Sequence, residues 1–147
     1  MQHHQNPEAL AASLACWSGP ITLAPLPGGL TNTNFLVADG GRKYVVRIGG
    51  DLKVHGIVRS IELAASRAAA AAGISPIVVH AEPGAMVLDY IEGKTLTPED
   101  IRDPRMLARL VPLIRHAHRD IPRFFRGPAP MFWPFQVIRD YTHTLEE

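Results

Sequence analysis

The chain has 147 residues, 46% of them hydrophobic, and its 15 lysines and arginines against 14 aspartates and glutamates give a formal net charge of +1. This composition excludes a wholly disordered or collagen-like chain, and the length suits one domain with a hydrophobic core. Its single cysteine excludes an internal disulfide framework and any multi-cysteine zinc site. No apolar run reaches the roughly 20 residues of a membrane-spanning helix and no signal peptide is evident, so we expect a cytoplasmic protein without a membrane partner.

The first 93 residues combine two expected helices with five expected strands. Asn6 can cap the first helix, Pro7 fits its first position, and Gly73 is a stop signal after the second helix. Apolar segments bounded by turn residues mark the strands, and Pro25 marks the first strand as an edge strand. We expect helices over residues 7–17 and 57–72, and strands over residues 21–26, 35–38, 43–48, 76–80 and 85–91.

The remainder of the chain is expected to be helical. Thr97 and Asp103 are each followed by proline, which is typical of a capped helix start. A helix over residues 105–118 should be kinked or restarted by Pro112. Its apolar residues are expected to face a core: Met106, Leu107, Leu110, Leu113, Ile114 and Ala117. An aromatic anchor is expected over residues 131–135, before a last helix over residues 136–145.

Positive charge is concentrated in residues 102–126, which hold seven arginines and two aspartates. Such a stretch is compatible with nucleic-acid binding, but also with the solvated face of a helix, which we take as the better interpretation. We therefore do not expect nucleic acid as a partner. A titration of the chain with nucleic acid at several salt concentrations would test this expectation. The arginines of this alternative binding face are Arg105, Arg109, Arg115, Arg119 and Arg123.

The turn between the first two strands is the first candidate functional element. Its glycines let backbone N–H groups approach a phosphate closely, and its threonine and asparagine side chains add donors. The turn does not match a P-loop, and a Gly-Gly pair is also typical of an ordinary turn between strands. The candidate residues are Gly28, Gly29, Thr31, Asn32, Thr33 and Asn34.

Arg47 and Glu62 form a candidate ion pair. Arg47 lies near the end of an apolar strand, where an arginine needs a partner, and Glu62 in the following helix can supply the carboxylate. Kinases position nucleotide phosphates with a basic strand residue held by a helix glutamate. The alternative is an ordinary exposed salt bridge worth about 0–1 kcal/mol, and these two residues leave both interpretations open.

The order of these elements resembles the N-terminal part of the choline/ethanolamine kinase and aminoglycoside phosphotransferase family, particularly its bacterial choline-kinase-like members. The segments that carry the resemblance are residues 28–35, 44–48, 73–76 and 89–93, together with Glu62. The similarity covers about residues 20–145, because residues 118–122 and 135–141 resemble the first helices of the large lobe in that family.

This resemblance implies an α+β fold: a kinase-like small lobe, with a five-stranded antiparallel sheet and one main helix, followed by the first helices of an incomplete large lobe. Residues 1–93 would be the nucleotide-binding lobe and hinge, and residues 94–147 the beginning of the large lobe. The chain would then be a truncated gene product, a fragment or one piece of a split protein.

The resemblance also implies ATP as the nucleotide and a small-molecule hydroxyl acceptor such as choline or ethanolamine. Residues 28–34 would cover the nucleotide phosphates, Arg47 would bind them and Glu62 would orient Arg47. An arginine at this position favours forked phosphate contacts. The backbone that would hydrogen-bond the adenine belongs to Asp89, Tyr90 and Ile91.

The catalytic loop of such kinases has the pattern His-x-Asp-x-x-x-x-Asn, and a metal-binding Asp follows it. The triplet at residues 118–120 is similar to the first part of the protein-kinase version, but Phe125 stands at the asparagine position. We therefore predict no catalytic and no metal-binding residue, and expect Mg²⁺ only if a large lobe is supplied. Asp89-Tyr90 and Asp140-Tyr141 are chance matches to the metal-binding motif.

The chain alone is accordingly expected to be inactive. The alternative class is a non-catalytic, pseudokinase-like module that binds a nucleotide or a partner. An exposed apolar surface where the large lobe would pack would favour association with such a partner.

Overall fold

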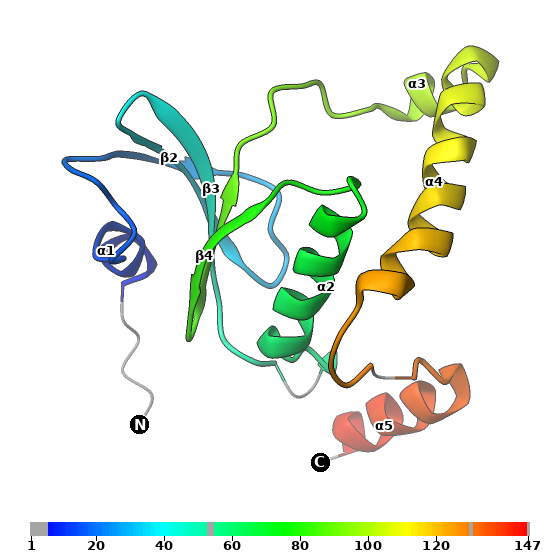
Figure 1. Cartoon of the computed structure of the whole chain (residues 1–147). Helices are drawn as coiled ribbons and strands as arrows, with labels where there is room; N and C mark the ends of the chain where they lie inside the picture. The colour runs from blue at the N-terminus through cyan, green and yellow to red at the C-terminus, as the bar shows by residue number, and fades with distance from the viewer. Residues whose placement is uncertain (1–5, 53–54, 130, 147) are drawn as a thin grey trace.

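The computed structural model describes residues 6–52, 55–129 and 131–146. Residues 1–5, on which the expectation of no signal peptide depends, lie outside the described residues. Five strands form one antiparallel sheet in the order β1-β2-β3-β5-β4, with helices on both sides (Figure 1). The strands are β1 (Thr22–Leu26), β2 (Thr33–Asp39), β3 (Arg42–Ile48), β4 (Val78–Glu82) and β5 (Ala85–Asp89). The helices are α1 (Pro7–Ala12), α2 (Arg59–Ala71), α3 (Pro98–Arg102), α4 (Pro104–Phe124) and α5 (Pro134–Glu146). The expected α+β class and five-stranded sheet are confirmed.

Turn residues set the connections at the edge of the sheet. Gly40 and Gly41 have φ values of 55° and 82°, as a tight hairpin with a right-handed twist requires. Pro25 lies in β1 at the edge of the sheet, as expected. Thr33 and Asn34, expected in the preceding turn, instead begin β2, because the β2–β3 pairing extends to the end of β3. The first helix ends at Ala12, before the expected end at residue 17.

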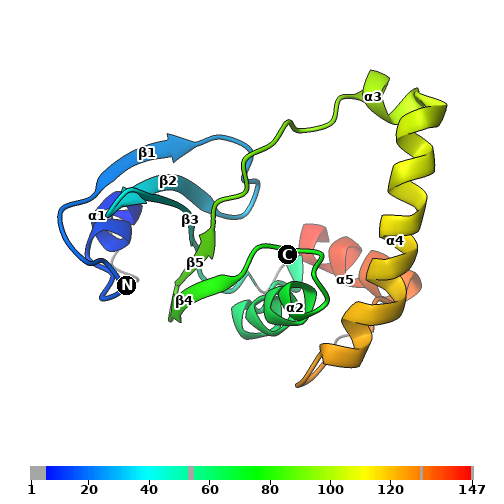
Figure 2. The same ribbon diagram turned by 45° about the horizontal axis from the view of Figure 1, so that its top comes forward.

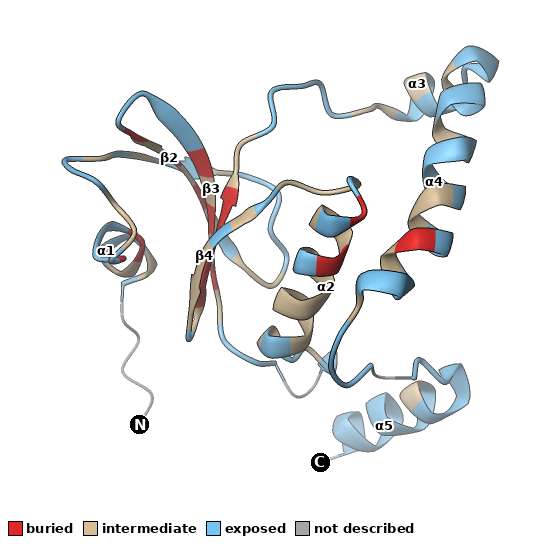
Figure 3. Cartoon of the chain, in the orientation of Figure 1, coloured by how far each residue is buried: buried red, intermediate tan, exposed pale blue. Residues whose placement is uncertain are grey.

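The hydrophobic core lies between α1 and one face of the sheet. Alternate residues of β2 and β3 point to this face, together with residues of β5, and they pack against Ala11 and Leu14. Val37, Val46 and Val87 are the largest fully buried side chains. Burying each contributes on the order of 2 kcal/mol from the apolar area removed from water. Figure 3 shows the buried residues of the sheet in red.

The opposite face of the sheet is only partly covered. Residues that alternate with the core lie on this face, and α2 packs against its β4 side. The β2 and β3 residues that point to this face, away from α1, remain half-buried. The described chain therefore leaves the β2–β3 half of this face accessible. The half-buried residues are Asn34, Leu36, Ala38, Val45 and Arg47.

The expected restart of a helix at Pro112 is wrong. One helix, α4, runs from Pro104 to Phe124 and includes both Pro112 and Pro122. Pro112 and Ala108 are exposed, so the Ala108 carbonyl that loses its helical partner can bind water instead. Figure 2 shows α4 on the side of α2 away from the sheet.

The expected burial of α4 and of the aromatic anchor is also largely wrong. Leu113 and Ile114 are 49% and 51% exposed, and Trp133 in the segment before α5 is 52% exposed. Leu107, Phe132 and Phe135 are exposed as well, whereas Met106, Leu110 and Ala117 are half-buried. An amphipathic pattern indicates which face would be buried but does not supply the partner, and α4 packs mainly against α2 and α3.

Asp39 joins the segment after α1 to the β2–β3 hairpin. Its carboxylate accepts hydrogen bonds from the Ser18 backbone N–H at 2.8 Å and from the Ser18 hydroxyl at 2.9 Å. The backbone bond is the main cause that holds the pKa of Asp39 below its ordinary value of 3.8. Because the folded-state pKa is the lower one, this group stabilises the fold above the unfolded pKa, and the contribution disappears as the pH falls through the folded pKa.

We therefore expect Asp39→Asn to lower the Tm at pH 7 and to flatten the loss of Tm between about pH 5 and pH 2. Thermal unfolding followed by circular dichroism across this range would measure both effects. Glu146→Gln is the matched control, because Glu146 is exposed at the end of α5. A Tm change of equal size at every pH would contradict the role of the Asp39 carboxylate.

Candidate functional site

The glycine-rich turn between β1 and β2 is folded tightly onto the end of β3. Gly28 has a φ of 108°, which favours glycine. A Cβ on Gly29 would lie 2.2 Å from the Asn32 carbonyl oxygen, and a Cβ on Gly49 would lie 2.8 Å from Asn32 Oδ1. The observed shape of the turn therefore requires glycine at positions 28 and 29, and Gly49 leaves room for the Asn32 side chain at the end of β3.

The expected ion pair between Arg47 and Glu62 is present. Arg47 Nη1 lies 3.3 Å from Glu62 Oε1, so β3 and α2 are joined beside the turn. The Arg47 side chain is 40% exposed, and a pair this exposed stabilises the fold by at most about 1 kcal/mol. Its main consequence is to place a guanidinium at the end of the accessible sheet face.

Sequence reasoning missed Arg59, the first residue of α2. Its guanidinium donates to Glu62 Oε2 at 2.5 Å, to the Thr31 carbonyl at 2.8 Å and to the Gly50 carbonyl at 2.8 Å. The i,i+3 spacing to Glu62 is a signal that could have indicated the first contact. The contact with Thr31 has no comparable local signal, because it joins residues 28 positions apart.

A cavity of about 330 Å³ adjoins the turn and the two arginines. Arg47 and Arg59 share the Glu62 carboxylate, so these three groups carry one net positive charge, and the part of the cavity that they line suits an anion. Glu82 also lines the cavity and is paired with His80 at 3.2 Å. The other lining residues include Asn32, Gly49, Leu63, Pro83 and Met86.

The predicted hinge, Asp89, Tyr90 and Ile91, lies at the other end of the sheet. The Asp89 N–H donates to the Ile77 carbonyl at 3.0 Å, and the Tyr90 N–H donates to the Lys43 carbonyl at 3.2 Å. The Ile91 N–H has no partner among the described residues. Of the three backbone N–H groups, Ile91 therefore offers the available donor, beside a hollow of about 580 Å³.

The predicted phosphate-binding residues and the predicted hinge residues lie beside opposite ends of β3. In the β3–β5 register Arg47 pairs with Met86, whereas Tyr44 pairs with Asp89 at the hinge. Three residues of strand span about 10 Å, and the half-buried Val45 lies between the two ends. A ligand that reaches both ends must therefore lie along this apolar face.

The triplet at residues 118–120 lies elsewhere, where α4 contacts α2. The buried Asp120 carboxylate is surrounded by positive or hydrogen-bonding partners, and the Arg119 hydrogen bond is the main cause that lowers its pKa. His116 also lies 2.8 Å from the Ala72 carbonyl oxygen beyond the end of α2. The partners of Asp120 are Arg119 at 2.9 Å, Arg123 at 3.1 Å and His116 Nδ1 at 2.8 Å. Asp120 therefore holds three side chains of α4, one of which, His116, reaches the end of α2.

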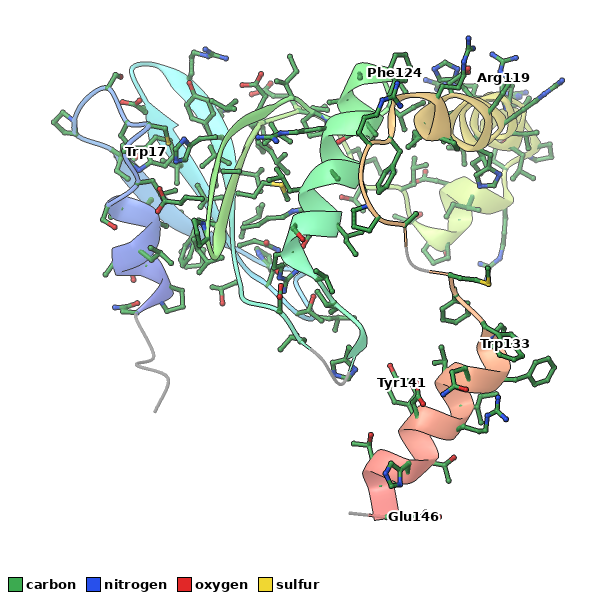
Figure 4. All side chains as sticks on the ribbon, turned by 60° about the horizontal axis from the view of Figure 1, so that its bottom comes forward. Trp17, Arg119, Phe124, Trp133, Tyr141 and Glu146 are labelled. Atoms are coloured by element: carbon green, nitrogen blue, oxygen red, sulfur yellow. The ribbon has the colours of Figure 1, made fainter. Side chains whose placement is uncertain are left out.

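The expected aromatic anchor, residues 131–135, lies apart from the glycine-rich turn and the predicted hinge. Figure 4 shows Trp133 at the start of α5, far from the sheet side that carries Trp17.

Among the described residues no group of three His, Cys, Asp or Glu side chains could hold a metal ion. Nor does that part of the chain contain a helix long and apolar enough to cross a membrane.

These features define a kinase-like small lobe: an antiparallel five-stranded sheet, a glycine-rich turn, an arginine–glutamate pair between β3 and α2, and an extended segment after β5. The chain is similar over 95% of its length to a choline/ethanolamine kinase family protein from Mesorhizobium loti, with 35% identity and a TM-score of 0.66. The predicted resemblance to the choline/ethanolamine kinase family is thus confirmed, and the chain matches the N-terminal lobe of that fold.

An ethanolamine kinase from Plasmodium vivax shares the fold, with a TM-score of 0.65 at 19% identity over 86% of this chain. The chain spans 45% of the Mesorhizobium loti protein and 37% of the Plasmodium vivax protein. No family model matches the sequence. No curated protein matches it either.

Proposed function

We propose that this chain is the nucleotide-binding part of a cytoplasmic, ATP-dependent phosphotransferase whose acceptor is a small hydroxyl compound such as choline or ethanolamine. Residues 1–93 form the nucleotide lobe in this proposal, and residues 94–147 begin a helical lobe. The observation that carries it is Arg47, which Glu62 holds beside the glycine-rich turn at the end of an accessible apolar sheet face. The similarity to choline/ethanolamine kinase family proteins supports the phosphotransferase class.

The proposed ATP lies along β3. Its adenine packs over Leu36 and Val45 and accepts a hydrogen bond from the Ile91 N–H, which is the available donor at the hinge. Its phosphates lie under the turn, where Gly28 and Gly29 allow close backbone approach and Arg47 supplies a forked donor pair. Thr31, Asn32, Thr33 and Asn34 complete the proposed phosphate cover.

The residues beside the turn do not fit Mg²⁺. Both oxygens of the Glu62 carboxylate there are engaged by Arg47 and Arg59. Magnesium sites in phosphotransferases use carboxylate and amide oxygens that are free to coordinate the metal. We therefore propose that the ligands of the metal, and the base for the acceptor hydroxyl, come from a large lobe.

A non-catalytic binding module is the second candidate function. It is favoured by the apolar surface of α4 and the segment before α5, where Leu113, Ile114, Phe132 and Trp133 are exposed. Exposed apolar side chains mark a protein contact where they form one large patch. In this proposal the partner is a helical lobe that covers the surface.

Nucleic-acid binding is not favoured. Arg119 and Arg123 point back to Asp120 rather than forming an open basic row with Arg105 and Arg109. Their charge is partly neutralised by that carboxylate. A nucleic-acid titration at two salt concentrations would measure any remaining affinity.

Nucleotide titrations followed by NMR chemical shifts test the ATP proposal. We expect the chain to bind ATP no better than roughly millimolar, because an open half-cleft leaves one adenine face in water. Arg47→Ala should weaken ATP binding roughly tenfold, since it removes a charge-assisted contact, and should leave adenosine binding unchanged. Arg109→Ala, on the exposed side of α4, is the matched control. Equal losses for ATP and adenosine would contradict phosphate recognition by Arg47.

A further inference from the structure

We propose that Arg59 is the positioning residue of this site: it holds the glycine-rich turn in place and, through Glu62, sets the position of Arg47. The inference rests on the proposed nucleotide function and adds a residue to it. Arg59 joins three segments, because its guanidinium donates to Thr31 in the turn, to Gly50 after β3 and to Glu62 in α2.

Arg59 holds Glu62 more closely than Arg47 does. The Arg59–Glu62 contact is 2.5 Å, whereas the Arg47–Glu62 contact is 3.3 Å. The Arg59 side chain is 17% exposed, and the Arg47 side chain is more than twice as exposed. Arg47 can therefore turn toward a phosphate without leaving the Glu62 carboxylate unpaired.

The neighbouring residues leave space for the Arg59 guanidinium and also bind the Arg59 backbone. A Cβ on Gly49 would lie 2.9 Å from Arg59 Nη2 and 3.2 Å from the Thr31 carbonyl oxygen, so glycine at this position leaves room for the observed Arg59–Thr31 contact. The backbone N–H of Arg59 donates to Asp51 Oδ1 at 2.7 Å, which anchors the start of α2. Both the side chain and the backbone of Arg59 are thus held.

The contact with Thr31 also orients a potential phosphate donor. The C=O and the following N–H of a trans peptide point in opposite directions. Because Arg59 holds the Thr31 carbonyl, the N–H of Asn32 points away from Arg59. That N–H has no hydrogen-bond partner among the described residues, so it is available to an anion.

Hydrogen exchange of the nucleotide-free chain tests the structural half of the inference. Arg59→Ala should speed amide exchange about tenfold at Thr33 and Asn34, which pair with neighbouring strands where the turn meets β2, because it removes charge-assisted bonds that hold the turn. Arg67→Ala is the matched control, since Arg67 is exposed in the same helix. Unchanged exchange at Thr33 and Asn34 in Arg59→Ala would overturn the inference, whether or not the chain binds ATP.

Nucleotide titrations test the functional half. Arg59→Ala should weaken ATP binding about tenfold and leave adenosine binding unchanged, and Arg59→Lys should fail to restore ATP binding because an ammonium cannot span three acceptors in a fork. Full rescue by lysine, or equal losses for ATP and adenosine, would overturn the positioning role. If the unmodified chain binds no ATP, the proposed function fails, while the exchange result still decides whether Arg59 sets the turn.

Discussion

The purified 147-residue chain, incubated with Mg-ATP and either choline or ethanolamine, is expected to release no ADP above a protein-free blank. The sequence contains no His-x-Asp-x-x-x-x-Asn loop, and the residues near Arg47 do not fit a metal. Metal ions and positioned charges supply most of the transition-state stabilisation in phosphoryl transfer. Turnover should therefore be absent rather than merely slow.

A coupled ADP-release assay measures this prediction, with a complete choline kinase as the positive control. An aminoglycoside belongs in the same acceptor panel, because the family predicted from the sequence also includes aminoglycoside phosphotransferases. Choline-dependent ADP release that Arg47→Ala abolishes would show that this chain is a complete enzyme. Release that Arg47→Ala leaves unchanged would indicate a contaminating kinase.

Asp120→Ala is expected to loosen α4 from α2. The buried carboxylate holds Arg119, Arg123 and His116, and His116 in turn reaches the Ala72 carbonyl beyond the end of α2. Removing the shared acceptor leaves these groups without their common partner, so amide exchange in α4 should rise roughly tenfold or more. Asp140→Ala, an exposed aspartate of α5, is the matched control.

The same residue separates a structural role from a catalytic one. In any longer, active form of this protein, Asp120→Asn should leave turnover within a few-fold of the unmodified enzyme, because Asp120 faces arginines at a helix contact. A general base would lose on the order of a hundredfold. A loss of that size would overturn the structural assignment and would place the acceptor hydroxyl beside α4.

The sequence alone predicted the strand order along the chain, the hairpin turns and the ion pair between Arg47 and Glu62. Each depends on local signals: alternation of apolar residues, glycine at tight turns and a charged residue in an apolar strand. The predicted ends of elements were less accurate. Thr33 and Asn34 belong to β2 because of pairing with another strand, which a turn composition does not indicate.

Only the tertiary structure revealed Arg59 and the role of Asp120. The Arg59–Thr31 contact joins residues 28 positions apart, and the His116–Ala72 contact joins residues 44 positions apart. It likewise showed that, of the three predicted hinge residues, Asp89 and Tyr90 have bonded N–H groups, whereas the Ile91 N–H has no partner among the described residues. An amphipathic pattern on α4 predicted a buried face, yet Leu113 and Ile114 are exposed. Periodicity specifies which side chains share a face, whereas burial and positioning depend on which distant segment packs there.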